Sequence, residues 1–314
     1  SLRLVADSLT LSDFDELVPR VRRLAGNVQG SVEVGGTLGR PRGRGILTVS
    51  NGAFELPRLG MAGRQASAEI ELAGDSIIVR RFRMADTDSP RDTAALSGVI
   101  QIAGTSWADW LVDVRSVANR FRVIDDPRLA SAEADWNLAA AGTLGTPRIT
   151  GTVGLPYAVF TIGPRGRARR APTDTTGVAR RGIPSVSGVL VSLGSDVRLR
   201  SKDANVQLTG AVELFGPLDR PWISGSVYAT RGTYRVDLGV IKRTFQVDSG
   251  SVIVEGTPDI SPALDIYASY IVRTPERENI QIGAHVYGTT DRPRLDLTSD
   301  LGSAVAQSEI ISYL

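Results

Sequence analysis

The sequence predicts an all-β protein whose antiparallel sheet meanders continuously along the chain. Two observations support this prediction. Apolar and polar residues alternate strictly in segment after segment, and only glycines and polar turn residues separate the segments, which leaves no room for crossover helices. The clearest alternating segments are residues 66–72, 132–138, 206–214, 264–272 and 280–286. Each is therefore expected to be a strand with one apolar face and one wet face.

Residues 1–25 depart from this pattern and are expected to form a short strand and an amphipathic helix. Ser12 is placed to cap the helix, and Pro19 interrupts or resets it. Its apolar residues at helical spacing are Phe14, Leu17, Val18, Val21 and Leu24. The sheet is then expected to run without a domain boundary over residues 26–314.

Composition argues against most enzyme classes. The 36 Lys and Arg residues nearly balance the 34 Asp and Glu residues, so a net charge of +2 gives no overall field to hold nucleic acid. The chain has no Cys, and its one histidine, His285, alternates with apolar residues and is expected on a wet face. Usual zinc sites and His-based triads are excluded. Asp125 and Asp126 precede a proline, as in a turn. We therefore expect a protein that is not an enzyme and that binds no metal or cofactor.

An internal repeat gives the strongest information on organisation. The pattern Gly-x-Leu-x-x-Pro-x-x-x-Gly, with an aromatic nine residues after its last glycine, occurs three times and begins near residues 36, 142 and 216. A degenerate fourth copy retains Gly288 and Pro293. The stretch from Gly to Pro is expected to end one strand and turn the chain. Asn51-Gly52, further along the first copy, predicts a two-residue hairpin turn.

Residues 163–182 lack apolar periodicity and are expected to form a disordered loop. Deletion of residues 164–181 is expected to leave folding intact. Two interpretations of this loop remain open, a solvated surface loop or a contact with anionic headgroups or an acidic partner. Its basic residues are Arg165, Arg167, Arg169, Arg170, Arg180 and Arg181.

Several motifs, in order along the chain, resemble the C-terminal part of the TamB family. They include Leu24-Ala25-Gly26, the Gly-Thr-Leu-Gly-x-Pro-Arg copies at Gly36 and Gly142, residues 54–60, residues 245–256 and residues 259–268. The tail over residues 308–314 fits the segment that follows in the family. The resemblance covers essentially the whole chain.

The resemblance implies a long curved sheet that forms an open hydrophobic trough, a β-taco, in the periplasm of a diderm bacterium. It also implies a non-enzymatic conduit for phospholipid acyl chains between the inner and outer membranes, in a parent protein whose inner-membrane anchor lies outside these residues. The alternative is a scaffold for outer-membrane protein assembly, which pairs a strand edge with an Omp85-type partner, TamA. The expected trough lining comprises Val153, Leu155, Val206, Leu208, Leu264, Ile266, Tyr270, Val272, Ile280, Ile282 and Val286.

The apolar strand faces alone leave two architectures open. Two sheets packed face to face, as a sandwich or a closed sheet, would turn the same side chains into an ordinary core, and the residues alone favour this architecture. In an open trough these side chains would instead line a surface for acyl chains, whose burial is favourable at about 0.8 kcal/mol per CH₂. The resemblance favours the trough.

Overall fold

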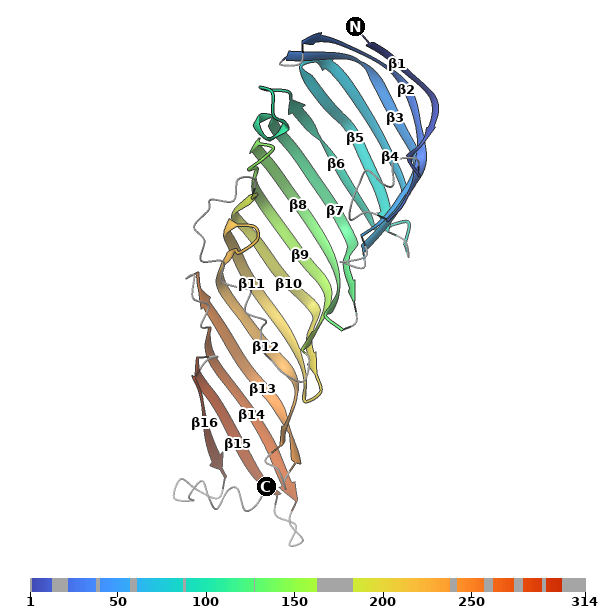
Figure 1. The fold of residues 1–314 in the computed structure, drawn as a ribbon. Coiled ribbons are helices and arrows are strands. Elements are labelled where there is room, and N and C mark those ends of the chain that lie inside the picture. Colours follow the sequence, from blue (N-terminus) through green and yellow to red (C-terminus); the bar gives the residue numbers. More distant parts are fainter. Residues whose placement is uncertain are drawn as a thin grey trace.

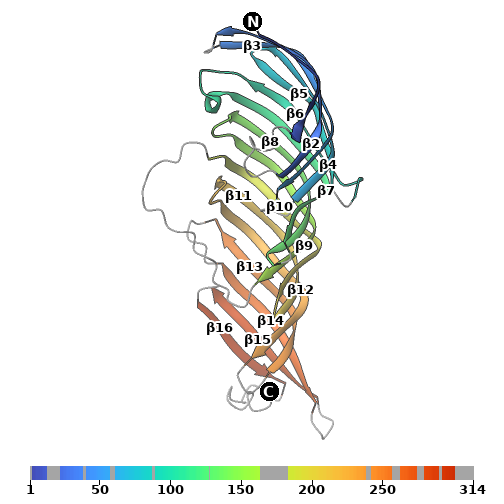
Figure 2. The ribbon, with the colours of Figure 1, turned by 45° about the vertical axis from the view of Figure 1, so that its right-hand side comes forward.

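The chain forms a single open sheet of 16 strands whose spatial order is the order of the sequence (Figure 1). This computed structural model describes residues 2–12, 22–37, 40–56, 61–86, 89–126, 128–162, 183–237, 242–256, 262–273, 279–289 and 292–300. Strand follows strand from the N-terminal to the C-terminal end of an elongated, twisted molecule (Figures 1 and 2). The prediction of an all-β, curved and open sheet is therefore confirmed, and the sandwich is excluded.

The strands are long for a globular protein, and most have more than ten residues. The first eight are β1 (Leu2–Thr10), β2 (Arg22–Thr37), β3 (Arg40–Leu56), β4 (Met61–Gly74), β5 (Ser76–Asp86), β6 (Thr93–Gln101), β7 (Leu111–Asp126) and β8 (Ala130–Thr143). The others are β9 (Arg148–Ile162), β10 (Ser185–Ser201), β11 (Ala204–Pro217), β12 (Trp222–Asp237), β13 (Lys242–Glu255), β14 (Ala263–Arg273), β15 (Asn279–Thr289) and β16 (Arg292–Ser299).

The N-terminal helix is not supported by the structure. Leu24 lies within β2, so the sheet begins before Gly26, and no α-helix occurs among the described residues. Residues 13–21, which include most of the expected apolar face, lie outside the described residues. A 3₁₀ turn over Trp107–Asp109 lies between β6 and β7, and Leu11 and Ser12, directly after β1, also have 3₁₀ conformation.

The turns of the repeat are where the sequence predicts them. The Gly-to-Pro stretches connect β2 to β3, β8 to β9, β11 to β12 and, in the degenerate fourth copy, β15 to β16. The last glycine of the copy at 142, Gly151, has a φ of 128°, and a Cβ there would lie 2.1 Å from the backbone oxygen of Asn137. Only glycine fits this close approach between β8 and β9.

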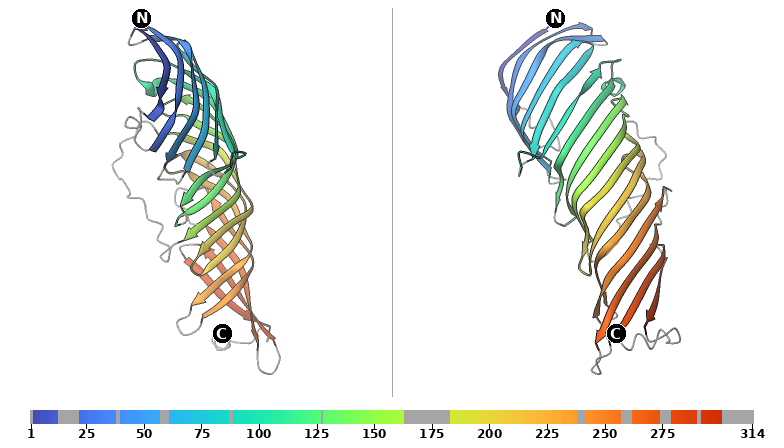
Figure 3. Two further views of the ribbon diagram at one scale, coloured as in Figure 1. Left: turned by 90° about the vertical axis from the view of Figure 1, so that its right-hand side faces the viewer. Right: turned by 180° about the vertical axis from the view of Figure 1, so that it is seen from behind.

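The predicted hairpin at Asn51-Gly52 is wrong. Both residues lie inside β3, where the pairing with β4 shifts between Val49 and Gly52. Asn51 does adopt a positive φ of 53°, but this left-handed residue forms a bulge and does not reverse the chain. Similar shifts occur within strands such as β5, β7 and β13, and because bulges bend strands, they help to give the sheet its curvature (Figure 3).

One pair of neighbouring strands, β9 and β10, runs parallel, while every other neighbouring pair is antiparallel. Ser185 lies opposite Arg148, at the start of β9, and Ser201 lies opposite Ile162, at its end. β9 therefore ends at one edge of the sheet and β10 begins at the opposite edge, a full strand length away. At about 3.3 Å per residue, that distance is roughly 45 Å. The sequence did not predict this parallel step.

The two faces of the sheet differ in how well their side chains are covered. Phe121, Val197 and Ile282 are fully buried, although the described strands form a single layer. A single sheet covers side chains best on the face around which it curls, because that face brings neighbouring strands together. We call the face that carries these three residues the inner face and the opposite one the outer face.

Phe121 provides a test of this packing, because it packs with residues of four other strands, β4, β5, β6 and β8. It belongs to a cluster with Ala66, Met84 and Ala94, and its ring meets Trp136 edge-on at a centroid distance of 5.9 Å. Phe121→Ala is expected to lower the free energy of unfolding by about 3–5 kcal/mol, since it removes a buried aromatic and leaves a cavity.

Urea titration followed by circular dichroism measures this loss. Val117→Ala, on the outer face of the same strand, is the control, because Val117 is 49% exposed. Its expected effect is below about 1 kcal/mol. Equal effects of the two substitutions would contradict the assignment of the faces.

Candidate functional site

All the residues expected to line a trough lie on the inner face. Strand register settles this, because directly paired residues project to the same side. On β9 and β11 they are Val153, Leu155, Val206 and Leu208, and on β14 and β15 they are Leu264, Ile266, Tyr270, Val272, Ile280, Ile282 and Val286. Tyr270, for example, pairs with Ile282, and Ile266 pairs with Val286. Residues that are more than a hundred positions apart in the sequence thus lie on one face of the sheet, several strands from one another.

Three apolar clusters follow one another along the inner face. The first, on β3–β8, includes Ala66, Met84, Ala94 and Phe121, with Phe54 packed against them. The second, on β7–β11, includes Ala132, Ala158 and Val197, with Phe160 beside them. The third, on β12–β16, includes Phe245, Ile280, Ile282 and Ala284. The repeat aromatics Phe54 and Phe160 therefore each contribute to one cluster.

Sequence reasoning missed some of the largest inner-face side chains as lining residues, among them Phe121 and Phe245. The reason is clear at Phe121. The pairing shifts between Ala118 and Phe121, so two inner-face residues are three positions apart and the alternation changes phase. Positive φ at Arg120, 47°, marks the bulge in the structure but has no counterpart in the alternation pattern.

The inner face is almost free of charge. On the described strands, and away from the hairpin turns, register places one basic side chain on it, that of Arg243 on β13, opposite Val236. Asp86, 3% exposed, lies at the end of β5 and accepts a hydrogen bond from the backbone N–H of Arg122 at 3.0 Å. Since β6 begins at Thr93, opposite Asn119, this part of β7 lacks a neighbour on that side. Asp86 supplies the missing acceptor.

The outer face is largely polar, with scattered aliphatic and aromatic side chains. His285 lies on it, as the sequence predicts, opposite Tyr267 on β14. Its ring stacks on Tyr267 and Tyr287 at centroid distances of 4.2 and 4.8 Å. Its Nε2 lies 2.7 Å from Oδ1 of Asp265. Stacking and the carboxylate contact satisfy the histidine, so no further group is needed to explain its position.

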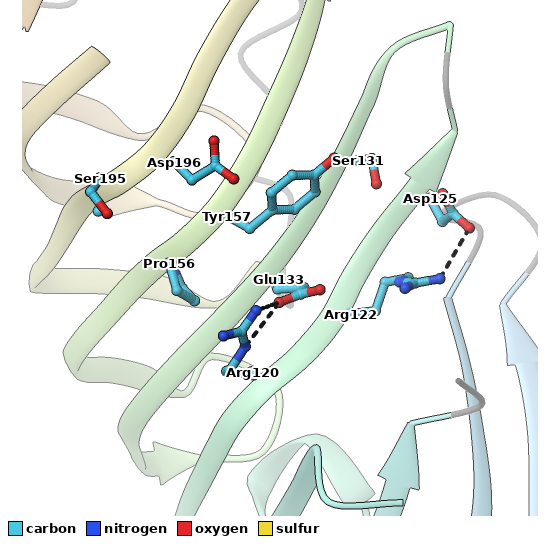
Figure 4. Close-up of a pocket in the computed structure, with 10 residues that line it drawn as sticks. Arg120, Arg122, Asp125, Ser131, Glu133, Pro156, Tyr157, Ser195 and Asp196 are labelled. Carbon is cyan, nitrogen blue, oxygen red and sulfur yellow. Dashed lines mark hydrogen bonds and ion pairs between the residues drawn. The ribbon is translucent and has the colours of Figure 1, made fainter. Parts of the chain in front are cut away.

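The outer face also carries a polar pocket of about 640 Å³ over β7–β10 (Figure 4). It is lined by Arg120, Arg122, Asp125, Ser131, Glu133, Pro156, Tyr157, Gly194, Ser195 and Asp196. The pocket lies where β7, β9 and β10 each shift register, so bulges hollow the surface there.

The two arginines of this pocket already have partners within it. Nη2 of Arg120 lies 2.8 Å from Oε2 of Glu133, and this hydrogen bond raises the pKa of the Arg120 guanidinium above its ordinary value. Nη1 of Arg122 lies 3.6 Å from Oδ2 of Asp125 (Figure 4). These exposed ion pairs leave the pocket without a basic group held ready for a ligand.

The other residues that the sequence analysis singled out lie either in a turn or outside the described residues. Asp126 ends β7, and its Oδ1 accepts from the backbone N–H of Arg128 at 3.0 Å, as expected of a turn. The hydrogen bond from Arg128 lowers the pKa of Asp126. The six arginines between residues 165 and 181 lie outside the described residues.

Among the residues that the structure describes, no group of three or more His, Asp or Glu side chains is arranged to hold a metal ion. Within the same ranges, no helix is long and apolar enough to cross a membrane.

Comparison with known proteins bears on the same part of the chain. The family model for the TamB C-terminal domain matches residues 80–314, which is most of the sequence and includes β6–β16 in full. A search of curated proteins found no match. The family match covers the second and third apolar clusters completely.

Proposed function

Because this chain belongs to the TamB family, we propose that it is part of a hydrophobic conduit that carries phospholipid between the inner and outer membranes. The observation that carries the proposal is the apolar inner face of an open sheet, with a single basic side chain along its described strands. In this proposal the lining residues hold acyl chains while the polar outer face remains in water.

The energetics of such a surface are favourable. An acyl chain that leaves water for an apolar surface gains about 0.8 kcal/mol per CH₂, so a continuous lining needs no specific site. At about 4.8 Å between strands, sixteen strands extend the inner face over roughly 70 Å. A lipid can therefore move along it and exchange one apolar cluster for the next, with no large difference in burial between positions.

Location and partners belong to the same proposal. A conduit between two membranes operates in the periplasm, and we place the anchor of the parent protein in the inner membrane of a diderm bacterium. TamB proteins act in a translocation and assembly module with an Omp85-type partner, and we propose a TamA-like protein as the partner here. Holding acyl chains requires neither catalysis nor a cofactor.

Native mass spectrometry of the purified chain tests lipid binding directly. We expect phospholipid to co-purify and, after its removal, fluorescent phospholipid to bind again. A lipid-free chain that also fails to take up the fluorescent lipid would contradict the conduit. Bovine serum albumin and an unrelated all-β protein of similar size provide the positive and negative controls.

The open ends of the sheet favour a second candidate function. β1 and β16 each pair with one neighbour among the described strands, so each has an edge on which another strand can add. A scaffold for outer-membrane protein assembly would use these edges. Backbone-directed crosslinking from β16 to a partner strand, with no effect of inner-face substitutions, would favour the scaffold over the conduit.

A further inference from the structure

Arg243 is the one basic residue that strand register places on the inner face of the described strands. Its guanidinium lies over the ring of Tyr270, with Cζ 5.9 Å from the ring centroid. Its Nη1 donates to the backbone oxygen of Lys242 at 3.3 Å, but its buried Nε has no hydrogen-bond partner. A buried N–H without a partner costs free energy comparable to a lost hydrogen bond, and more when the group is charged.

A second orphaned polar atom lies in the same region. The buried Oγ of Ser299, on β16, also lacks a hydrogen-bond partner. Ser299 pairs with Ile282, and Ile282 pairs with Tyr270, the residue beneath the Arg243 guanidinium. This row of paired residues therefore runs from Ser299 to the tyrosine beneath Arg243, through Ile282 of the third apolar cluster.

These two groups have the chemistry of a site for an anion. A guanidinium recognises phosphate through charge-assisted hydrogen bonds, and a hydroxyl can donate one more. The surrounding surface, which includes Phe245 and Val272, is apolar. A free anion would gain nothing from that surface, whereas an amphiphile would bury its chains there.

We propose that Arg243, with Ser299 as a second donor, forms a subsite for the phosphate of a phospholipid whose acyl chains lie on the third apolar cluster. This inference rests on the proposed function and adds to it a fixed position for the headgroup. Arg243 is the second residue of β13, so the subsite lies at the sheet edge where β13 and β15 begin and β14 and β16 end. A headgroup at this edge remains close to water.

The test compares two fluorescent lipids with identical acyl chains, phosphatidylglycerol and diacylglycerol, bound to the delipidated protein. The wild-type chain is expected to prefer phosphatidylglycerol by about tenfold, the effect of one or two charge-assisted hydrogen bonds. Arg243→Gln is expected to abolish this preference and to leave diacylglycerol binding unchanged. Arg243→Lys keeps the charge and should retain part of the preference. This result would show that the Arg243→Gln chain loses its preference because the charge is missing and not because the chain misfolds.

Arg235→Gln is the matched control, because Arg235 lies on the outer face of β12, opposite Thr244. It should keep the full preference. An Arg243→Gln chain that still prefers phosphatidylglycerol overturns the subsite while lipid binding stands. A wild-type chain that binds neither lipid overturns the proposed function as well. Competition by millimolar inorganic phosphate that equals competition by unlabelled phosphatidylglycerol would assign the site to free phosphate and overturn the lipid assignment.

Discussion

Ile266→Arg is expected to yield a folded chain that no longer carries lipid. Ile266 lies half-buried on the inner face of β14, opposite Gly250 and Val286. Gly250 has no side chain, so a longer residue has room to lean along the open sheet and keep its guanidinium hydrated. The charge then lies in the path of the acyl chains. An acyl chain in contact with it loses the apolar surroundings that favour its burial.

Retention of fluorescent phospholipid by the Ile266→Arg chain should fall by about tenfold or more, since a single unpaired charge in an apolar site costs several kcal/mol. Thermal unfolding should remain cooperative. Ile271→Arg is the matched control, since Ile271 lies on the outer face of the same strand and is 56% exposed. Undiminished lipid transfer by a folded Ile266→Arg chain would refute the role of this face.

Deletion of residues 164–181 is expected to destroy the native pairing of β9 with β10. The sequence alone suggests the opposite, because the segment has no apolar periodicity. The parallel pairing, however, requires a connection across roughly 45 Å of sheet. After the deletion, four residues separate Ile162 from Ser185. Even fully extended, they span only about 18 Å.

Replacement of the same residues by a Gly/Ser segment of equal length tests whether folding requires the length of this segment or its amino-acid sequence. This replacement should fold, because a flexible linker of that length spans the distance. Circular dichroism and limited proteolysis distinguish the two chains. If the deletion variant melts like the wild type, the parallel pairing is refuted; if the equal-length replacement fails to fold, the segment contributes more than length.

The predictability of the strand faces depends on whether bulges interrupt the alternation. The pairing of β14 with β15 has no register shift, so residues 264–272 and 280–286 show their faces directly in the sequence. In β7 the shift after Ala118 hides Phe121. Asn51-Gly52 shows the same limit, since a positive φ is required both in a hairpin turn and in a bulge. Tertiary pairing decides between them.

The parallel step keeps the four Gly-to-Pro turns on one edge of the sheet. In a simple meander, successive turns alternate between the two edges, so two copies of the repeat share an edge only when an even number of strands separates them. The second copy lies between β8 and β9 and the third between β11 and β12, which is an odd interval. The parallel pair of β9 and β10 lies between them and returns the third and fourth copies to the same edge as the first two. A sheet of this kind can therefore gain or lose whole hairpins freely, but a single strand only together with a connection long enough to cross it.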